Sequence, residues 1–523
     1  MEVACDRSLS YTLVYEVIKE ACRVGVQEFC LGSGTRNMPF LAALKAQVGV
    51  KLHFWYEERS CAFFALGRSR QSGRPVAVIT TSGTAAGELL PAAMEAHYSA
   101  TPILLITADR PKVLRGTGAP QAAEQANLFG VYAKHAQDLD SLGDCDLKAW
   151  DQQGAAHLNV CLDEPLPDTF LEFDDLKIHE PPLMHGSSLK KTSDALDLFL
   201  SPLTQPFVIV GDLPDEARDP VKHFLLQLKA PVFLEGLSGL REDPALQALR
   251  VFRTDGLFSF FEERSYQVDG VLRIGGMPTF RFWRDLEHHL EIEVFSISQQ
   301  PFSGLSLSSV HTERLALFFD QYIPKKVFQP LGNDRFPQEL RTLLTNEPHS
   351  EPGVVYELSR KIPKGSRIYL GNSMPIREWD LAATSQMKGF TLNASRGLNG
   401  IDGQLSTFFG LCEKGKENWG IFGDLTTLYD LAAPWILPTL EDMCIRIVVI
   451  NNSGGKIFSR LFSHVEMQNQ HCLNFSHLAA HWNLPYYSHE AYLKERLMDP
   501  ICLIELKPDL VSSERFWKKY SAL

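Results

Sequence analysis

The chain has 523 residues, of which 45% are hydrophobic and 22% are charged. This length exceeds a single hydrophobic core of ordinary size, and the composition is typical of a globular enzyme and excludes a disordered protein. The net charge is −12, with no block of basic residues, which argues against a nucleic-acid or anionic-membrane partner. We therefore expect three domains that act on small molecules.

The N-terminus, MEVACDRSLS, lacks a basic segment followed by an apolar core, and no stretch approaches the ~20 apolar residues of a membrane span. We therefore expect a cytoplasmic protein. The 10 cysteines include no C-x-x-C pair, so buried thiols are expected rather than disulfides or a zinc site. His477 and His481 are spaced as metal ligands on a helix, but without a third ligand nearby they indicate one face of an amphipathic helix.

From residue 26, short β-branched or aromatic runs alternate with segments of helical periodicity. The runs read VQEFCLG, VKLHFWY, PVAVIT and PILLITAD, and the helical segments include MPFLAALKAQ and AAGELLPAAMEAH. This alternation predicts a parallel sheet covered by helices, which we assign to a first domain over residues 1–180. A proline-rich, acidic stretch near residues 163–183 is expected to be a linker.

Two further alternating units follow. PFVIVGDLP, APVFLEG, VDGVLRIGGMP and LEIEVFSIS predict a central Rossmann-like domain over residues 181–350. SRIYLGNS, FTLNASRG, WGIFGDL, IRIVVINN and ICLIEL predict a third domain over residues 351–523. The predicted fold class is therefore α/β, with three doubly wound parallel-sheet domains.

Ligands of such sheets bind at the carboxyl ends of the strands, so the residues that follow each run are the candidates for chemistry. In the first domain these are Gly34-Thr35-Arg36, Glu57-Glu58-Arg59, Thr81-Ser82-Gly83-Thr84 and Asp109-Arg110-Pro111. In the third domain they are Gly371-Asn372-Ser373, Ser395-Arg396-Gly397, Gly423-Asp424 and Asn451-Asn452. Small residues, amides, carboxylates and arginines thus recur at the predicted strand ends.

Asp424 and Asn452 close two successive predicted strands and are expected to lie on one edge of the third sheet. A hard cation such as Mg²⁺ or Mn²⁺ prefers oxygen ligands, which these side chains and the carbonyl of Gly454 offer, with phosphate oxygens completing the shell. Gly-Asp turns and Asn-Asn pairs also occur as ordinary strand-to-loop connections.

The G-D pair followed one strand later by N-N resembles the diphosphate-binding motif of thiamine-diphosphate enzymes, and YEER places Glu58 where that superfamily carries its catalytic glutamate. The resemblance implies that Glu58 hydrogen-bonds the aminopyrimidine nitrogen of the cofactor and favours the imino tautomer, which deprotonates the thiazolium carbon. Read alone, the triplet from Glu57 to Arg59 is equally typical of a solvated helix start.

The longer motifs GDLTTLYDL and NNSGGKIFS closely resemble the 2-succinyl-5-enolpyruvyl-6-hydroxy-3-cyclohexene-1-carboxylate synthases of menaquinone biosynthesis. GTRNMPF, FWYEERSCAFFALG, TSGTAAGELLPA, LLITADRP, GAPQA, GNSMPIR and SRGLNGIDG extend the match over the first and third domains, and the middle domain matches weakly. The resemblance implies a transferase that decarboxylates 2-oxoglutarate and adds the remaining succinyl unit to isochorismate, with thiamine diphosphate and a divalent metal as cofactors.

Both substrates carry carboxylates, for which arginine is the fitting partner. The resemblance assigns substrate binding to Thr35, Arg36, Arg110, Gln121, Arg281, Arg377, Arg396, Ile457, Phe458 and Leu461. It assigns cofactor binding to Glu58, Thr81, Gly83, Ser373, Ile401, Gly423, Asp424, Leu425, Asn452 and Gly454, with Ile401 beneath the cofactor rings. The chain departs from the family at Thr35, which replaces a serine, at Met38, which replaces a threonine, and at Phe282, where some members carry a second basic residue.

In relatives of this architecture the cofactor spans a subunit interface, so a homodimer or homotetramer is expected. One alternative is another thiamine enzyme, such as an acetolactate synthase or a 2-oxoacid decarboxylase. A second is a non-catalytic metabolite-binding member of the fold, although such a protein would not need Glu58 together with Asp424 and Asn452. A nicotinamide or flavin oxidoreductase is disfavoured because no G-x-G-x-x-G joins a predicted strand to a helix.

Overall fold

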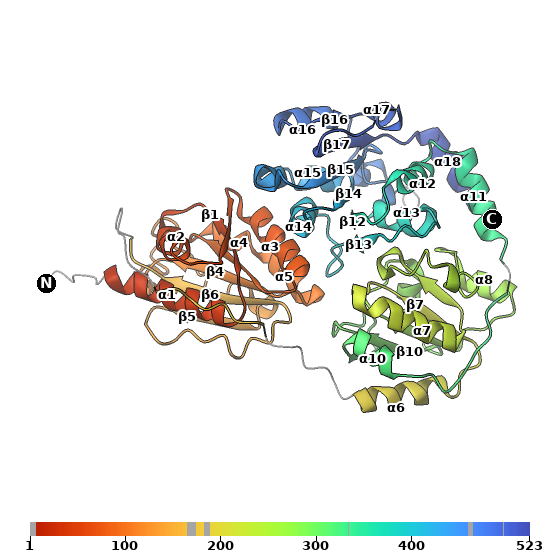
Figure 1. The fold of residues 1–523 in the computed structure, drawn as a ribbon, viewed down its shortest axis with the longest axis horizontal. Coiled ribbons are helices and arrows are strands. Elements are labelled where there is room, and N and C mark those ends of the chain that lie inside the picture. The colour runs from red at the N-terminus through yellow and green to blue at the C-terminus, as the bar shows by residue number, and fades with distance from the viewer. Residues whose placement is uncertain (1–6, 165–173, 182–188, 333, 459–463, 495) are drawn as a thin grey trace. The chain divides into compact units, whose positions relative to one another are not determined.

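The computed structural model describes residues 7–164, 174–181, 189–332, 334–458, 464–494 and 496–523 (Figure 1). Their strands form three sheets of 6, 5 and 6 strands, and every strand pairing in these sheets is parallel. This confirms the predicted fold class. The predicted domain boundaries near residues 180 and 350 stay a prediction.

The chain contacts define two compact units. The first unit comprises Met1–Met184, Ser395–Glu413 and Thr427–Glu441, and the second comprises His185–Ala394, Lys414–Thr426 and Asp442–Leu523. The first unit therefore takes two short segments from the C-terminal part of the sequence.

The first unit is built on a sheet with the strand order β2-β1-β3-β4-β6-β5. The strands are β1 (Glu28–Gly32), β2 (Lys51–Trp55), β3 (Val76–Thr80), β4 (Ile103–Asp109), β5 (His135–Leu139) and β6 (Ala155–Cys161). Its helices are α1 (Arg7–Arg23), α2 (Met38–Lys45), α3 (Glu58–Ser72), α4 (Thr84–Gly87), α5 (Leu90–Ser99), α14 (Gln404–Leu411) and the 3₁₀ segment η8 (Ala433–Leu440). The four strands predicted in this region are confirmed as β1 to β4, whereas β5 and β6 were not predicted.

Helices α3 and α14 approach each other closely because glycines face the partner helix on both sides. A Cβ at Gly67 would lie 2.1 Å from the carbonyl oxygen of Thr407, and a Cβ at Gly410 would lie 2.3 Å from that of Phe64. A side chain at either position would separate the helices. This packing fixes the axis of α3, whose first residue is Glu58.

The second unit contains the other two sheets. The middle sheet has the order β11-β10-β9-β7-β8, and the C-terminal sheet has the order β13-β12-β14-β15-β17-β16. The strands of the middle sheet are β7 (Pro206–Val210), β8 (Val232–Leu234), β9 (Gly270–Ile274), β10 (Glu293–Ser298) and β11 (Val310–Thr312). Those of the C-terminal sheet are β12 (Arg367–Leu370), β13 (Thr391–Asn393), β14 (Glu417–Gly423), β15 (Cys444–Ile450), β16 (Tyr486–Tyr487) and β17 (Ile501–Leu506).

Helices pack on both of these sheets (Figure 1). They are α6 (Leu189–Leu200), α7 (Arg218–Leu228), α8 (Leu257–Glu263), α9 (Arg281–Asp285), α10 (Leu315–Gln321), α11 (Phe336–Asn346), α12 (Glu351–Lys361), α13 (Met374–Ala382), α16 (Phe475–His481), α17 (His489–Lys494) and α18 (Leu510–Tyr520). Helix α15 (Asp424–Tyr429) begins in this unit directly after β14. None of the helices in the described ranges has the length and apolar character that a membrane crossing requires.

The buried side chain of Arg241 joins the middle sheet's connecting segment to the end of α13. Its guanidinium donates hydrogen bonds to the carbonyl oxygens of Asp380 at 3.1 Å, Ala383 at 3.0 Å and Thr384 at 3.2 Å. It also pairs with Glu242 at 2.7 Å. Asp380 lies in the last turn of α13, Ala383 is its C-cap residue and Thr384 follows, and the carbonyls at a helix end find no donors within the helix.

Replacing Arg241 by methionine is expected to destabilise the second unit by about 3 kcal/mol, because three carbonyls and one carboxylate lose a buried partner. A fall in the temperature of thermal unfolding would measure the effect. Arg360→Met is the matched control, since the guanidinium of Arg360 pairs with Glu357 on the exposed face of α12 and lies over the ring of Tyr356 at 5.3 Å. This change should cost less than ~1 kcal/mol. Equal shifts for the two variants would contradict the assigned role of Arg241.

Candidate active site

Glu58 begins α3 at the carboxyl edge of the first unit's sheet. The preceding residue, Glu57, caps the helix and accepts hydrogen bonds from the amides of Arg59 at 3.1 Å and Ser60 at 2.8 Å. Glu58 itself lies over the end of β1, since a Cβ at Gly32 would be 3.5 Å from its Cγ. Burial, with a smaller contribution from the neighbouring Glu57 and Glu88, raises the pKa of the Glu58 carboxyl and so favours a group that holds a proton.

Three loops meet beside Glu58 at this edge of the sheet. A Cβ at Gly34 would lie 2.5 Å from the Cβ of Thr81, so the backbone of the loop after β1 packs against the Thr81 side chain of the loop after β3. Gly83 has a φ of 87° and lies against Gln121, whose Cα would be 3.4 Å from a Cβ at that position. Gln121 also has a positive φ, 57°. The loop after β4 therefore closes over the loop after β3.

Arg36 and Arg110 lie at the same edge, and the positive charge of Arg110 acts on the guanidinium of Arg36. Arg36 is 6% exposed and donates a hydrogen bond to the carbonyl oxygen of Leu162 at 3.1 Å. Burial and the charge of Arg110 lower its pKa. Arg110 reaches Gln121 Oε1 at 3.4 Å, and its buried Nε has no hydrogen-bond partner in the described part of the chain. Two neighbouring guanidinium groups with unused donors are suited to a carboxylate ligand.

Arg396 and Ile401 belong to a loop that precedes α14, and a buried carboxylate holds this loop. Glu95 on α5 accepts hydrogen bonds from the amides of Gly397 and Leu398, each at 2.8 Å. Burial raises the pKa of Glu95, while these bonds and the charge of Arg396 act in the opposite direction. Glu95 was not among the residues predicted from the sequence: a single carboxylate in the segment AAMEA indicates a buried charged group but does not identify its partner.

In the second unit, Asp424 follows β14 and is 2% exposed. Its Oδ1 accepts from the amide of Leu425 at 2.6 Å, and its Oδ2 accepts from the amide of Gly454 at 2.9 Å. Nε2 of His471 lies 3.2 Å from the same Oδ2. The structure therefore brings Asp424 and the Gly454 loop together, and burial raises the pKa of the Asp424 carboxyl.

Asn452 follows β15 and carries an uncommitted oxygen. Its Nδ2 donates to Glu351 Oε1 at 2.8 Å, and its buried Oδ1 has no partner within the described residues. Gly454 has a φ of 133°, and a Cβ there would lie 2.6 Å from the carbonyl oxygen of Gln468. Within the described residues, the carbonyl oxygen of Gly454 accepts one hydrogen bond, from the backbone amide of Lys456 at 2.9 Å. These oxygens fit a hard cation bound to a diphosphate.

Glu351 is a buried partner of this site that sequence reasoning missed. It begins α12 and bonds Asn452, and burial together with the carboxylate of Asp424 raises its pKa. No local motif marks Glu351, because only the tertiary fold brings α12 to the end of β15.

The remaining predicted residues of the second unit lie as follows. Ser373 joins β12 to α13 at a φ of 72°, a costly conformation for a residue with a side chain, and its carbonyl accepts from Arg377 at 2.6 Å. Gly423 ends β14, Leu425 lies in α15, and Ile457 and Phe458 lie in the 3₁₀ turn η9 (Lys456–Phe458). Leu461 lies outside the described residues.

Arg281, the residue predicted from the middle domain, is exposed and pairs with Asp285 on its own helix at 3.3 Å. The next residue, Phe282, is 3% exposed and packs among Phe207, Phe258 and other core side chains. The position where some relatives carry a second basic residue is therefore a core position in this chain.

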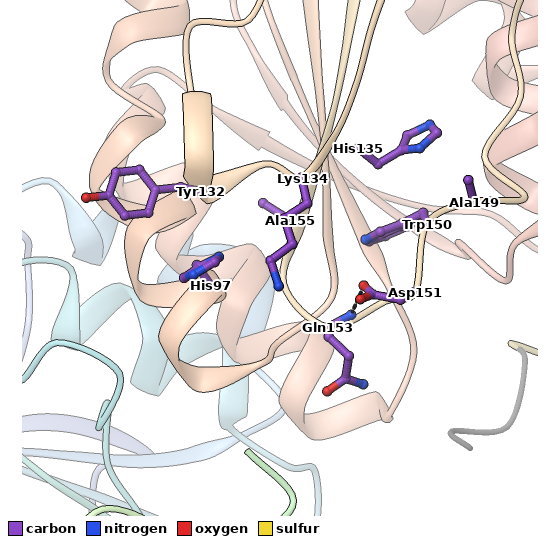
Figure 2. A pocket seen from close by; sticks show the side chains of 9 residues that line it. All are labelled: His97, Tyr132, Lys134, His135, Ala149, Trp150, Asp151, Gln153 and Ala155. Atoms are coloured by element: carbon purple, nitrogen blue, oxygen red, sulfur yellow. Dashed lines mark hydrogen bonds between the residues drawn. The ribbon is translucent and has the colours of Figure 1, made fainter. Parts of the chain in front are cut away.

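A cavity of about 150 Å³ lies elsewhere in the first unit (Figure 2). It is lined by His97, Tyr132, Lys134, His135, Ala149, Trp150, Asp151, Gln153 and Ala155. None of the residues predicted from the sequence lines it, so this cavity is separate from the candidate active site.

Comparison with known proteins agrees with this geometry. Residues 12–128 match the family model described as the N-terminal TPP-binding domain of thiamine pyrophosphate enzymes. A solved structure described as a thiamin diphosphate-dependent enzyme of Mycobacterium smegmatis superposes with a TM-score of 0.69 over 95% of this chain and 99% of that one, at 15% identity. That likeness shows the fold. The chain thus has the fold of a thiamine-diphosphate enzyme.

Three curated relatives share one name, 2-succinyl-5-enolpyruvyl-6-hydroxy-3-cyclohexene-1-carboxylate synthase. The protein of Bdellovibrio bacteriovorus is 40% identical over 98% of both chains. That of Akkermansia muciniphila is 37% identical over 96% of this chain and 97% of its own length. That of Bacillus pumilus is 30% identical over 87% and 85%. The chain belongs to this synthase family, and the resemblance found in the sequence motifs is confirmed.

Proposed function

We propose that the chain decarboxylates 2-oxoglutarate and transfers the remaining succinyl-semialdehyde unit to isochorismate, giving 2-succinyl-5-enolpyruvyl-6-hydroxy-3-cyclohexene-1-carboxylate for menaquinone biosynthesis in the cytoplasm. The observation that carries the proposal is the pair Arg36 and Arg110, which lies at the same sheet edge as Glu58 and keeps a buried guanidinium donor uncommitted. A decarboxylase of monocarboxylic 2-oxo acids would have no need of two arginines there.

When bound, thiamine diphosphate supplies a nucleophilic carbon for the keto group and an electron sink for the loss of CO₂. Glu58 holds a proton against the pyrimidine nitrogen, a role suited to a carboxyl whose pKa is raised by burial. Thr81 and Gly83, in the loop after β3, are the neighbouring cofactor contacts that the family resemblance assigns.

The diphosphate end belongs to the second unit. Asp424, Asn452 and the carbonyl of Gly454 would hold Mg²⁺ or Mn²⁺, because they offer carboxylate, amide and carbonyl oxygens of which Asn452 Oδ1 is buried and unused. Ser373, Ile401, Gly423 and Leu425 complete the cofactor contacts that the family resemblance assigns.

The carboxylates of the two substrates are bound by arginines. We assign this role to Arg36, Arg110, Arg377 and Arg396, with Thr35, Gln121 and Ser373 as polar neighbours and Arg281 as the contribution of the middle domain. Ile457, Phe458 and Leu461 provide the apolar side of the isochorismate pocket. A site with little water favours loss of CO₂, since the charge of the carboxylate disappears in that step.

The test is an assay of the purified protein with thiamine diphosphate and Mg²⁺ that follows isochorismate by absorbance and the product by mass. Consumption of isochorismate that requires both 2-oxoglutarate and the cofactor, with the mass of the succinyl adduct, supports the proposal. Decarboxylation of 2-oxoglutarate without consumption of isochorismate would assign a different acceptor. Activity on pyruvate instead would indicate an acetolactate-synthase type of reaction.

We further propose that two copies of the chain assemble. An exposed apolar surface in the first unit, called the aromatic surface here, consists of Phe54, Tyr56, Tyr429, Leu431 and Trp435, each 44–51% exposed. The Trp435 indole donates to the carbonyl oxygen of Phe54 at 3.1 Å and packs edge-on against Tyr56 at 4.9 Å between ring centroids. Exposed large apolar side chains of this kind are typical of a protein interface.

Leu431→Glu is therefore expected to shift the protein from a dimer or tetramer toward a monomer and to lower activity in proportion, because a charge is expensive inside an interface. Sedimentation velocity and the assay above measure both effects. Val48→Glu makes the same change at a side chain that is 78% exposed and lies outside the aromatic surface, and should leave both unchanged. A wild-type monomer with full activity would refute the assembly.

A further inference from the structure

Strand β6 and the segments around it contain a buried cluster of polar side chains that the proposed function does not use. Asp109, Asp138 and Cys161 lie close enough together to suggest a metal site. Arg115 fills that position instead, with its Nη2 at 3.0 Å from Asp109, 2.7 Å from Asp138 and 3.1 Å from Cys161 Sγ. The hydrogen bonds from Arg115 hold the pKa of Asp138 well below its usual range. The cluster is therefore an ion-pair centre.

Asn159 on β6 links this centre to other parts of the unit. It is fully buried, and its Nδ2 donates to Asp109 at 2.9 Å and to Asp138 at 2.8 Å. Its Oδ1 accepts from Thr107 at 2.9 Å and from Gln125 at 2.9 Å. All four hydrogen bonds available to an asparagine side chain are made, so its orientation is determined by its partners.

The direction of each bond follows from the charge at one end. Because both carboxylates demand donors, Asn159 must present its NH₂ to them and its oxygen to Gln125. Gln125 must then present its own NH₂ to Asn159 and its oxygen outward. That oxygen accepts the backbone amide of Gly83 at 3.0 Å. A continuous and polarised chain of hydrogen bonds thus runs from Arg115 to the loop after β3.

The same centre reaches the two arginines of the candidate site. Asp109 Oδ1 accepts the backbone amide of Arg110 at 2.7 Å. The carbonyl oxygen of Asp109 accepts the amide of Leu162 at 2.9 Å, and the carbonyl of Leu162 in turn accepts the guanidinium of Arg36 at 3.1 Å. The segments that carry Gly83, Arg110 and Arg36 are therefore all connected by hydrogen bonds to the same ion-pair centre.

We propose that Asn159 and Gln125 are positioning residues for the reaction: their hydrogen-bond network sets the loop of Gly83 against the segments that carry Arg36 and Arg110. The assignment of those three residues rests on the proposed function. A network of this kind is costly to bury unless every member is satisfied, and a shift of about 1 Å in a binding group can lower a rate about a hundredfold. Apolar residues could fill the same space without that cost. The need to hold these loops in place is the reason for a polar network there.

The first measurement is amide hydrogen exchange of the cofactor-free protein, which needs no activity. Gln125→Met removes the oxygen that accepts the Gly83 amide. Asn159→Leu removes the partner of Gln125 instead, which is one hydrogen bond further from the loop of Gly83. Both are expected to speed exchange in the peptide containing Gly83 by about tenfold. Thr107→Val, which removes one hydrogen bond to Asn159 and the bond between the Thr107 hydroxyl and His157 Nε2 at 2.8 Å, is the substitute should Asn159→Leu fail to fold.

The second measurement is steady-state kinetics. The same variants are expected to raise KM for 2-oxoglutarate about tenfold while kcat changes less, because binding groups move and Glu58 does not. Gln137→Met is the matched control: within the described residues the Gln137 side chain bonds the backbone of residues 144 and 146, and its loss should change neither exchange at Gly83 nor KM.

Each outcome decides one claim. Unchanged exchange at Gly83 in Asn159→Leu or Thr107→Val overturns the transmission through Asn159. Faster exchange with wild-type KM and kcat overturns the positioning role and leaves the network purely structural. If the wild-type protein lacks the synthase reaction while exchange responds as expected, the proposed function fails and the hydrogen-bonded connection stands.

Discussion

Glu58→Gln is expected to lower kcat of the synthase reaction by about 10²–10⁴-fold, the range typical of a lost proton-transfer group. The amide has nearly the shape of the carboxyl but cannot hold a proton at the pyrimidine nitrogen. KM for both substrates should change little, because Glu58 contacts the cofactor in this mechanism and the arginines bind the substrates. Single-turnover decarboxylation of 2-oxoglutarate measures the step directly.

Glu57→Gln is the matched control for this variant. Glu57 precedes Glu58 and its carboxylate caps α3 through the amides of Arg59 and Ser60. A glutamine oxygen can accept one of those bonds, so the cost is expected to be about 1 kcal/mol of stability with near-normal kcat. Equal losses of activity in the two variants would show that the helix start, rather than the Glu58 carboxyl, is what the reaction needs.

The first unit shows which strands can be predicted from sequence. Strands β1, β3 and β4 are continuous apolar runs because helices cover both faces of the sheet. Strand β6 is equally buried, but AAHLNVC carries His157 and Asn159 among its apolar residues. Burial lowers the pKa of His157 to about 4 and keeps it neutral. A pattern of hydrophobicity does not reveal such a strand, because the hydrogen bonds of its buried polar residues are made with partners distant in sequence.

The candidate site was predictable to the extent that its residues follow strands. Asp424 and Asn452 could be paired because neighbouring parallel strands end at one edge, and the structure brings Asp424 to the Gly454 loop. Glu351 and Glu95 could not, because each reaches its loop from a helix distant in sequence. A pattern that is local in sequence cannot reveal such a partner.

Phe282 is a residue for which a comparison of motifs alone does not show what the side chain does. Comparison of motifs marks it as a lost basic residue, whereas its side chain is 3% exposed and lies in the core of the middle sheet's domain. A basic side chain there would be buried among phenylalanines without a partner, at a large cost. The difference from the family is therefore a change in packing, and whatever charge the middle domain contributes must come from other residues such as Arg281.

Asp424→Asn is expected to weaken the Mg²⁺-dependent binding of thiamine diphosphate by about a hundredfold, at least the loss that follows removal of a residue supporting a metal ligand. Asparagine keeps the size of the side chain but loses the charge. In the wild-type protein the amides of Leu425 and Gly454 donate to the Asp424 carboxylate, so the NH₂ of the asparagine must face either one of these amides or the metal. Titration calorimetry of the cofactor at several Mg²⁺ concentrations, with EDTA as the zero point, measures the effect.

Asp442→Asn supplies the control for that titration, because Asp442 precedes β15 at the opposite edge of the same sheet and, in the described part of the chain, pairs with the exposed Lys414 at 2.6 Å. Loss of one surface ion pair should leave cofactor binding unchanged. Asn452→Leu distinguishes the loss of a metal ligand from the loss of a contact that holds the loop. It removes the unused Oδ1 but leaves the hydrogen bond between Asp424 and Gly454 intact. A metal bound by Asp424 and Asn452 together requires both variants to lose the Mg²⁺ dependence, whereas loss in Asp424→Asn alone would mean that this carboxylate acts by holding the loop.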